Sequence, residues 1–593
     1  MSGHALRYSE VFHQFSQFTI HNSHITPSVK RLATYPQLYS LAKQLSQLYR
    51  THHVTQEALK NVGIALWQVL DIDAILPSQA LIIEQCHSNA IAQLPWECLY
   101  HPKLGFLGKH PEYTLSRLVS SDKRSSPPPL GPLSILQFTA QPENISRRRG
   151  HLAIEEERYW VRAALEPFIS TGKVRFYAPN CGDFTTLIKL LHSQSWHVVL
   201  LSGHAVFNQD GSPAFVFESE GGHGELVANA ELAQVFGATN VQCVVIAACQ
   251  SGDSSATGTS LAMQIAQAGV QYVVGMREQL IDRAASVFVR TICVALAQQT
   301  RVDMAVQQSR RAMTQLLAPN EVWRGAQSND PSVGQWCLPM LLSHFPTQPL
   351  VDWNFCLQPI SLPPVVGSKI ANPSVFIGHR PALRTLGEGL RSGTIRQLLI
   401  HGRGGLGKTA LAGQLAMTLE GYRVLVYQAS GKMAFIPTLA QALELPKVHC
   451  LETLLQKIVA ERWVLWLDNL ERIQNQCNGA LTDESIKTAL EILYQLETTD
   501  LRILLTSRRT MPQMTHLCNY HLTRPNFTDF SRYIQHLGLP YQFQQILKIY
   551  QVLGGNFQGV QLLQSMPLCF DTSGLTQQLA IVRRYLQAYS SMS

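Results

Sequence analysis

The strongest constraint on the fold is a series of short, unbroken apolar runs separated by stretches with helical spacing. Two of these runs, 198–201 (VVLL) and 244–247 (VVIA), stop abruptly at small residues that are followed by one reactive side chain. Strands buried on both faces of a parallel sheet have such continuous apolar sequences. The alternation therefore predicts an α/β fold with a mainly parallel sheet flanked by helices.

Proline-rich segments divide this alternation into parts. Three prolines at 127–129 and six within 346–373 predict breaks in regular structure. The chain of 593 residues, with 46% hydrophobic residues, is long enough for several cores. Residues 8–20 are predicted to form one or two strands. The expected order is an N-terminal α/β part (1–125), a core (126–345), a linker (346–373), a second α/β domain (374–524) and a helical module (525–593).

Composition excludes several classes of function. Twelve cysteines occur without a C-x-x-C pair, which argues against a zinc site or a disulfide framework and favours a reducing compartment. The net charge of +8 comes without a basic face carrying interleaved aromatic residues, so nucleic acid is not an expected partner. The N-terminus has no apolar signal core, and no stretch reaches the ~18 apolar residues of a membrane helix. We expect a cytoplasmic protein without a membrane partner.

One histidine and one cysteine follow the two apolar runs. His204 and Cys249 come just after the predicted carboxyl ends of the strands, where open α/β sheets place functional groups. A cysteine thiolate is a nucleophile, and a nearby imidazole can activate it and protonate the leaving amine. Gly203 permits close backbone approach, and the N–H of Cys249 is a second candidate oxyanion donor. The spacing alone leaves open a structural histidine and an inert buried cysteine.

The residues around this pair resemble the motifs of a known peptidase family. SGH at 202–204 and ACQSG at 248–252 are similar to the His and Cys motifs of caspase-like cysteine peptidases, most closely the CHAT family with its separase-like members. LPWE at 94–97 and AGVQYVVGM at 268–276 resemble further CHAT motifs in the same order, and the pattern RRA at 310–312 follows. The resemblance spans residues 80–345. It implies a caspase-like core, a catalytic pair of His204 and Cys249, and a protein substrate.

Asp282 has two alternative interpretations. In separase-like relatives an aspartate at the matching position helps to recognise a basic P1 side chain, and a carboxylate pairs well with arginine. Asp282 also immediately precedes the predicted helix 283–294, where it would serve as the N-cap.

The second α/β region contains a phosphate-binding loop. The P-loop, 402–409 (GRGGLGKT), follows the apolar run 397–400 and precedes a helical pattern. Its glycines let backbone N–H groups surround phosphates, Lys408 reaches the outer phosphates, and the Thr409 hydroxyl binds Mg²⁺.

Asp468 ends another apolar run and is the second candidate Mg²⁺ ligand, while Arg508 is placed to sense the terminal phosphate. The alternatives are an aspartate that merely ends a strand and a surface arginine. The candidate nucleotide-binding residues are Gly402, Gly404, Gly405, Gly407, Lys408, Thr409, Asp468 and Arg508.

Together with LDNLE at 467–471 and TSR at 506–508, this P-loop resembles the STAND class of NTPases, which includes NB-ARC proteins. The resemblance implies ATP or ADP with Mg²⁺ as cofactors, and a homo-oligomer that forms on activation. No winged-helix domain or sensor repeats are visible before residue 593, so the sensing part is expected to be either absent or supplied by a separate sensor or trigger protein. The sequence departs from the family at His379, where an arginine is usual, and at 553–557, which lacks the proline of a Gly-x-Pro motif.

The combined prediction is a cysteine endopeptidase controlled by an ATP-binding switch, in bacterial signalling, antiviral defence or programmed death. The alternative is a catalytically silent caspase-like scaffold within an ATP-dependent oligomerising adaptor.

Overall fold

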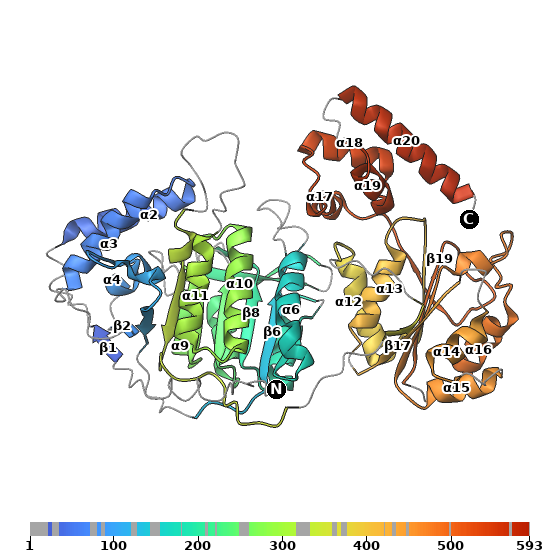
Figure 1. Ribbon diagram of the computed structural model, residues 1–593, viewed down its shortest axis with the longest axis horizontal. Coiled ribbons are helices and arrows are strands. Elements are labelled where there is room, and N and C mark those ends of the chain that lie inside the picture. Colours follow the sequence, from blue (N-terminus) through green and yellow to red (C-terminus); the bar gives the residue numbers. More distant parts are fainter. Residues whose placement is uncertain are drawn as a thin grey trace, which may run out of the picture. The chain divides into compact units, whose positions relative to one another are not determined.

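The computed structural model divides the chain into two compact units, residues 1–360 and 361–593, and each is described by itself (Figure 1). The structure describes residues 22–25, 35–70, 80–84, 89–119, 127–142, 154–179, 181–207, 212–219, 222–247, 260–315, 333–357, 365–368, 376–419, 421–429, 434–445, 450–496, 500–567 and 572–591. The strands predicted at 8–20 lie outside these residues. No helix in these ranges is long and apolar enough to cross a bilayer.

The first unit contains a nine-stranded, mainly parallel sheet with the order β1-β2-β5-β14-β13-β12-β8-β6-β7. Only the β13–β14 pair is antiparallel among the described neighbours, so two parallel blocks meet at this pair. The N-terminal part, 1–125, and the core, 126–345, were expected as successive parts, and they share this one sheet. Its strands are β1 (Asn22–Ile25), β2 (Ala80–Glu84), β5 (Thr114–Leu118), β6 (Leu133–Thr139), β7 (Val174–Tyr177), β8 (Val198–Ser202), β12 (Cys243–Ala247), β13 (Tyr272–Met276) and β14 (Pro339–Ser343).

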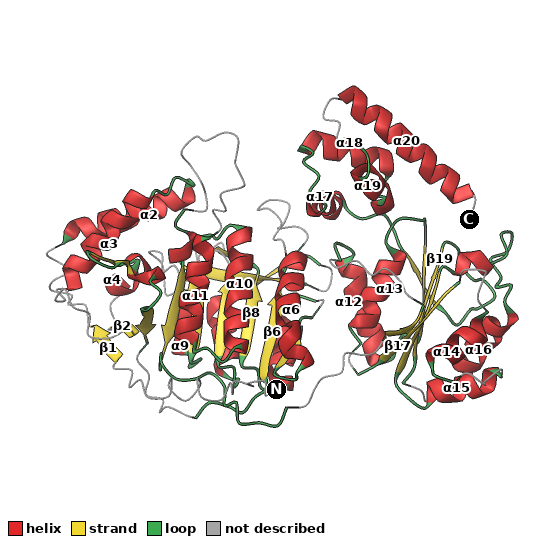
Figure 2. Cartoon of the chain, in the orientation of Figure 1, coloured by secondary structure: helices red, strands yellow, loops and turns green. Residues whose placement is uncertain are grey.

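Helices cover both faces of this sheet (Figure 2). Successive residues of β8 alternate between the two cores: Val198 and Leu200 belong to one, and Val199 and Leu201 to the other. This alternation explains why the strand is apolar throughout. One face carries α2 (Pro36–Arg50), α3 (Gln56–Leu70), α6 (Ile154–Ser170), α10 (Asp282–Ala297) and α11 (Val302–Thr314), and the other carries α7 (Phe184–Ser193), α8 (Asn229–Gly237) and α9 (Leu261–Gln267).

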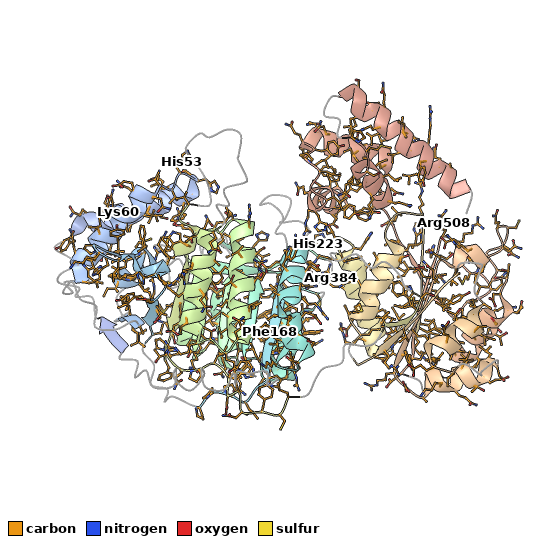
Figure 3. All side chains as sticks on the ribbon, in the orientation of Figure 1. His53, Lys60, Phe168, His223, Arg384 and Arg508 are labelled. Carbon is orange, nitrogen blue, oxygen red and sulfur yellow. The ribbon has the colours of Figure 1, made fainter. Side chains whose placement is uncertain are left out.

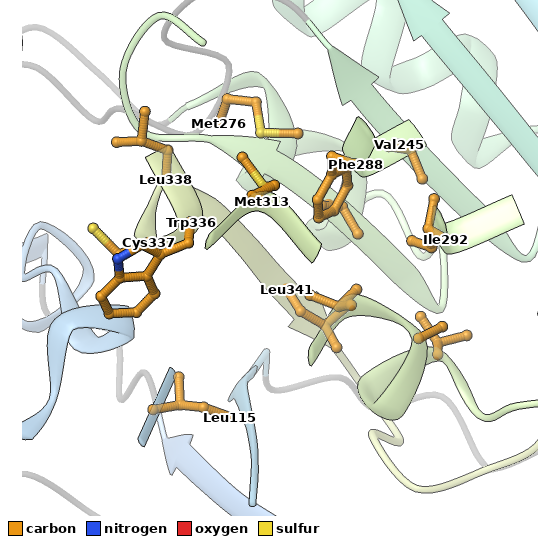
Figure 4. Packing of buried hydrophobic residues seen from close by; sticks show 14 of the residues in the cluster. Leu115, Val245, Met276, Phe288, Ile292, Met313, Trp336, Cys337, Leu338 and Leu341 are labelled. Atoms are coloured by element: carbon orange, nitrogen blue, oxygen red, sulfur yellow. The ribbon is translucent and has the colours of Figure 1, made fainter. Parts of the chain in front are cut away.

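Figure 4 shows part of the first core, where Phe288 and Ile292 of α10 pack near Val245 of β12. Smaller elements connect the main ones. They are α4 (Asn89–Ala92), the short helical turns at Trp96–Cys98, Leu107–Lys109 and Gln335–Cys337, the pair β3 (Tyr100–His101) and β4 (Gly105–Phe106), and the three-stranded sheet of β9 (His204–Phe207), β10 (Pro213–Glu218) and β11 (Gly224–Ala228).

The segment predicted as a linker, 346–373, takes part in both units. Leu350 and Val351 are buried in the first core, and the Tyr272 hydroxyl donates to the carbonyl oxygen of Gln348 at 2.7 Å. Further along, β15 (Val365–Gly367) pairs with a strand of the second sheet. The predicted linker is therefore too long at both ends, because apolar residues among the prolines find partners on either side.

The second unit has a six-stranded parallel sheet with the order β15-β17-β18-β19-β16-β20. Helices α12 and α13 pack on one face, α14 to α16 on the other, and α17 to α20 enclose a core of their own. The strands are β16 (Gln397–His401), β17 (Arg423–Gln428), β18 (Trp463–Asp468), β19 (Arg502–Ser507) and β20 (Cys518–His521). The helices are α12 (Arg380–Ser392), α13 (Lys408–Met417), α14 (Phe435–Ala442), α15 (Leu451–Val459), α16 (Glu484–Gln495), α17 (Phe527–His536), α18 (Phe543–Leu553), α19 (Phe557–Gln564) and α20 (Thr572–Ser591).

Candidate functional site

Two neighbouring strands carry the segments of the predicted catalytic pair. β8 and β12 are parallel and adjacent, and Ser202 pairs with Ala247 at their carboxyl ends. His204 lies two residues beyond Ser202, and Cys249 follows Ala247 by the same distance along the sequence. The two strands therefore end side by side, each two residues before a residue of the predicted pair. Cys249 itself lies outside the described residues, so the pairing of the two side chains stays a prediction.

Gly203 lets the chain pass directly from β8 into β9. A Cβ atom at this position would lie 2.5 Å from Cζ of Phe215 on β10, so any side chain would clash with a buried ring. His204 begins β9 opposite Val216 and is only 4% exposed. The glycine is thus required by close packing, and its predicted role as an oxyanion donor remains untested.

A buried polar network holds the end of β8. The Ser202 hydroxyl donates to Oε1 of Glu157 on α6 at 3.2 Å, and the Gln137 amide on β6 donates to the same oxygen at 3.0 Å. All three side chains are buried. The sequence analysis missed Glu157, because a glutamate within an acidic run at a helix start carries no signal of burial.

Asp282 is the first residue of α10, and the N-cap position is held by Ile281. The N-cap interpretation of Asp282 is therefore wrong by one position, although an aspartate in the first turn is still favoured by the helix dipole. The side chain lies outside what the structure describes, and its role in a P1 pocket stays a prediction.

Glu97 of the LPWE stretch lies at the centre of a buried ion cluster. Arg117 on β5 donates to both carboxylate oxygens, at 3.0 and 2.6 Å, and Nη2 of Arg310 on α11 lies 3.9 Å from Oε1. All three side chains are fully buried. Burial raises the pKa of Glu97, but Arg117 and, to a smaller extent, Arg310 and Arg277 outweigh it and hold the pKa below its usual value. Two stretches of the CHAT resemblance, LPWE at 94–97 and RRA at 310–312, thus contact each other in the core, where their role is structural.

The P-loop connects β16 to α13 with a backbone that requires glycine. Gly402, Gly405 and Gly407 have φ angles of 142°, 76° and 97°, in the region that other residues rarely adopt. Lys408 is the first residue of α13, and its ammonium donates to the carbonyl oxygens of Gly402 and Arg403 at 2.9 and 3.0 Å. The lysine therefore reaches back over the loop that is predicted to surround phosphates.

The two candidate Mg²⁺ ligands contact each other. Oδ1 of Asp468, at the end of β18, accepts from the Thr409 hydroxyl at 2.9 Å and from the Thr506 hydroxyl at 2.5 Å. Oδ2 makes no hydrogen bond of normal geometry within the described part of the chain, although the side chain is fully buried. Burial raises the pKa of Asp468, and hydrogen bonds from Thr506, Thr409 and Gln428 offset part of the rise. A buried carboxylate oxygen beside a threonine hydroxyl fits the oxygen ligands that Mg²⁺ prefers.

Two further side chains lie against the P-loop. Arg508, which is labelled in Figure 3, lies just beyond β19 and pairs with Glu471 at 3.1 Å. Its guanidinium carbon lies 3.4 Å from the point where a Cβ atom on Gly404 would be. His379 precedes α12, and its Nε2 lies 3.2 Å from the carbonyl oxygen of Leu406. Burial lowers the pKa of His379, so the neutral ring donates its Nε2–H to this carbonyl.

The helical module also contacts the P-loop, and the sequence analysis missed this contact. Nδ2 of Asn556 donates to the carbonyl oxygen of Gly404 at 2.9 Å, and the Phe557 N–H donates to that of Gly405 at 2.9 Å. Oδ1 of Asn556 accepts from the Gly559 N–H and caps α19. The stretch 553–557 stood out in the sequence only for its missing proline. An asparagine before a helix predicts a cap, but not the surface on which the helix docks.

Comparison with known proteins gave one family match and several solved structures of low similarity. The CHAT domain profile matches residues 56–355, and no curated protein matches the chain. Among solved structures, AMPPCP-bound DnaA from Aquifex aeolicus is 19% identical, with 32% of this chain and 61% of that chain covered and a TM-score of 0.24. A STAND protein with a tetratricopeptide repeat sensor from Pyrococcus horikoshii is 15% identical, with 37% and 34% covered and a TM-score of 0.26. Scores of this size carry no argument about function.

The CHAT match covers half of the chain, and it includes both strand-end segments and the cluster of Glu97, Arg117 and Arg310. The chain belongs to the CHAT domain family.

Proposed function

We propose that the chain is a cysteine endopeptidase whose activity is controlled by a nucleotide-binding switch in its second unit. The observation that carries the proposal is the pairing of Ser202 with Ala247, because the His204 and Cys249 segments follow these two residues. The family match agrees with this assignment.

In the proposed reaction, His204 takes the proton of the Cys249 thiol, and the thiolate sulfur attacks the carbonyl carbon of the scissile peptide bond. The backbone N–H groups of Gly203 and Cys249 stabilise the negative oxygen of the tetrahedral intermediate. The C–N bond breaks as His204 returns the proton to the leaving amine, and a thioester forms. Water then hydrolyses the thioester, with His204 as the general base.

Asp282 is the proposed carboxylate of a pocket for an arginine or lysine side chain in a protein substrate. Fluorogenic peptides that differ only at P1 test this role. Turnover after acidic or apolar residues, with none after arginine, would refute it.

In the second unit, the P-loop glycines and Lys408 would hold the phosphates of ATP or ADP, and Arg508 would contact the terminal phosphate. Thr409 and Asp468 would hold Mg²⁺, and the buried Oδ2 of Asp468 supports this. The metal nucleotide would bind one of two assembly states more tightly than the other and so favour that state.

We propose a homo-oligomer on activation, a separate trigger protein, and a cytoplasmic role in bacterial signalling or antiviral defence. The domain boundaries follow the sequence prediction, with the linker shortened as described.

Two measurements test the proposal. An active-site-directed thiol probe should label the wild type and not Cys249→Ala, whereas Cys356→Ala, at an exposed cysteine, should label normally. Absence of labelling in the folded, nucleotide-bound wild type would favour the silent scaffold. Peptidase rates with ATP should fall in Lys408→Ala relative to wild type. Equal rates would refute control by nucleotide.

A further inference from the structure

A pocket of about 140 Å³ lies at the amino-terminal end of the second sheet. It is lined by the loop before β16, the end of α16, and residues at the starts of β19 and β20. Gln397 is the first residue of β16, and the P-loop begins directly after the last residue of this strand. The pocket and the P-loop are therefore at opposite ends of β16, and no step of the proposed function uses the pocket.

Two buried polar atoms in its lining have no hydrogen-bond partner within the described part of the chain. The Gln397 side chain is 5% exposed; its Nε2 donates to the carbonyl oxygen of Leu490 at 3.3 Å, and its Oε1 has no donor. The Nε2 atom of His516 is also buried without a partner. A molecule bound in the pocket, either water or a larger ligand, would satisfy both atoms.

Aromatic and apolar side chains line the rest of the pocket, beside Thr394, Arg396 and Cys518. The Tyr494 and His516 rings stack with centroids 4.1 Å apart and planes 24° apart, and they form one polar-edged aromatic wall. Leu493 and Ile503 add apolar surface. Burial lowers the pKa of His516, although the charge of Glu491 raises it in part, so the ring is neutral at pH 7. The volume is close to that of an engineered cavity of about 150 Å³ that binds benzene.

We propose that this pocket binds a single-ring aromatic molecule that carries N–H donors, the class that includes aminopyridines and free pyrimidine bases. An N–H group of the ligand donates to Oε1 of Gln397, and the ring lies between the aromatic wall and Ile503. His516 Nε2 supplies the second polar contact. This inference is independent of the peptidase and of the nucleotide switch.

Titration of the full chain with 2-aminopyridine tests the proposal, with toluene as a probe of similar size that has no donor. The chain is first saturated with ADP, so that the P-loop site is blocked. We expect saturable binding of 2-aminopyridine that ADP and Lys408→Ala leave unchanged, and binding of toluene at least about tenfold weaker, which is the effect of one lost hydrogen bond. Competition by ADP, equal binding of both probes, or no saturable binding would overturn the proposal.

The variant Gln397→Leu distinguishes a loss of ligand affinity from a loss of folding stability. The variant removes an unpaired buried oxygen together with the long hydrogen bond to the Leu490 carbonyl, so its melting temperature should stay close to that of the wild type, while its affinity for 2-aminopyridine falls about tenfold. Tyr494→Ala removes half of the aromatic wall and should also weaken binding. Tyr585→Ala, at a similarly exposed tyrosine of α20, should not. Wild-type affinity in a folded Gln397→Leu variant would contradict the assignment.

Discussion

Replacing Glu97 by glutamine provides a quantitative test of how the CHAT core is held together. The substitution keeps the shape of the side chain and removes its charge. Arg117 would keep its hydrogen bonds to the carbonyl oxygens of Ala92 and Leu94, and Arg310 its bonds to that of Pro339. Two fully buried guanidinium groups would then lose the counter-charge that they share.

The size of the effect follows from this geometry. Breaking a buried ion pair by removing one partner costs ~3–5 kcal/mol, because an uncompensated charge stays in a medium of low polarity. The carbonyl contacts stabilise the two arginines in part, so we expect Glu97→Gln to lower the free energy of unfolding by about 3 kcal/mol at pH 7. Glu461→Gln is the matched control. Glu461 also has two cationic partners, Arg423 at 2.7 Å and Lys457 at 2.9 Å, but its side chain is 32% exposed and the loss should stay below ~1 kcal/mol.

The pH dependence has a definite sign. The pKa of Glu97 in the folded chain lies below its ordinary value, so its carboxylate contributes stability above the unfolded pKa of about 4.3. That contribution is lost as the pH falls through the folded pKa, where the wild type becomes protonated. The difference between wild type and Glu97→Gln should therefore be constant near neutral pH and shrink on acidification.

Hydrogen exchange of the α11 amides measures this difference, with the strands of the second sheet as an internal reference. The two units need not unfold together, so a local measurement is preferable to one global midpoint. A loss below ~1 kcal/mol at pH 7, equal to that of the Glu461→Gln control, would refute the argument that burial makes this cluster costly to break.

Three further substitutions have expected outcomes. Gly203→Ala should stop peptidase turnover and cost ~1–3 kcal/mol through its clash with Phe215, and thermal unfolding should show partial recovery when Phe215→Leu is added. Asn556→Ala should speed the release of a fluorescent ADP analogue, whereas Asn526→Ala, which removes only the cap of α17, should leave the rate unchanged. Asp468→Asn should abolish the Mg²⁺ dependence of ATP binding in calorimetry. It should also raise the unfolding free energy at pH 7, because a carboxyl whose folded pKa is raised destabilises the fold when it is charged.

The fold class could be predicted because each central strand is a continuous apolar run. The apolar run 198–201 lies within β8, the run 244–247 lies within β12, and both strands belong to the mainly parallel sheet. Pairing across long separations could not be predicted in the same way. The contact of β5 with β14 joins residues more than two hundred positions apart, and nothing in the local period of either strand identifies its neighbour. The N-terminal part, 1–125, was therefore predicted as separate from the core, 126–345.

The same distinction applies to the site residues: those within a contiguous motif could be predicted, and those that depend on distant contacts could not. The P-loop is contiguous, so its glycines could be named from the sequence, and three of them have the backbone angles that require glycine. Glu157 could not be found in this way. It lies in an acidic run that is typical of a solvated surface, and only its contacts with Ser202 and Gln137 reveal that it is buried. Side chains that act through distant partners carry no signal in a single sequence.

In the proposed switch, the contact of α19 with the P-loop would let the helical module respond to nucleotide without competing for it. Phosphates bind to backbone N–H groups of such a loop, whereas Asn556 and Phe557 use the carbonyl oxygens of Gly404 and Gly405. Both sets of hydrogen bonds can therefore exist at once. A shift of these peptide groups on nucleotide binding would change the two contacts with α19 directly. Because a ligand can bias two states only through such differential contacts, Asn556 is the residue at which we expect the coupling to be lost first.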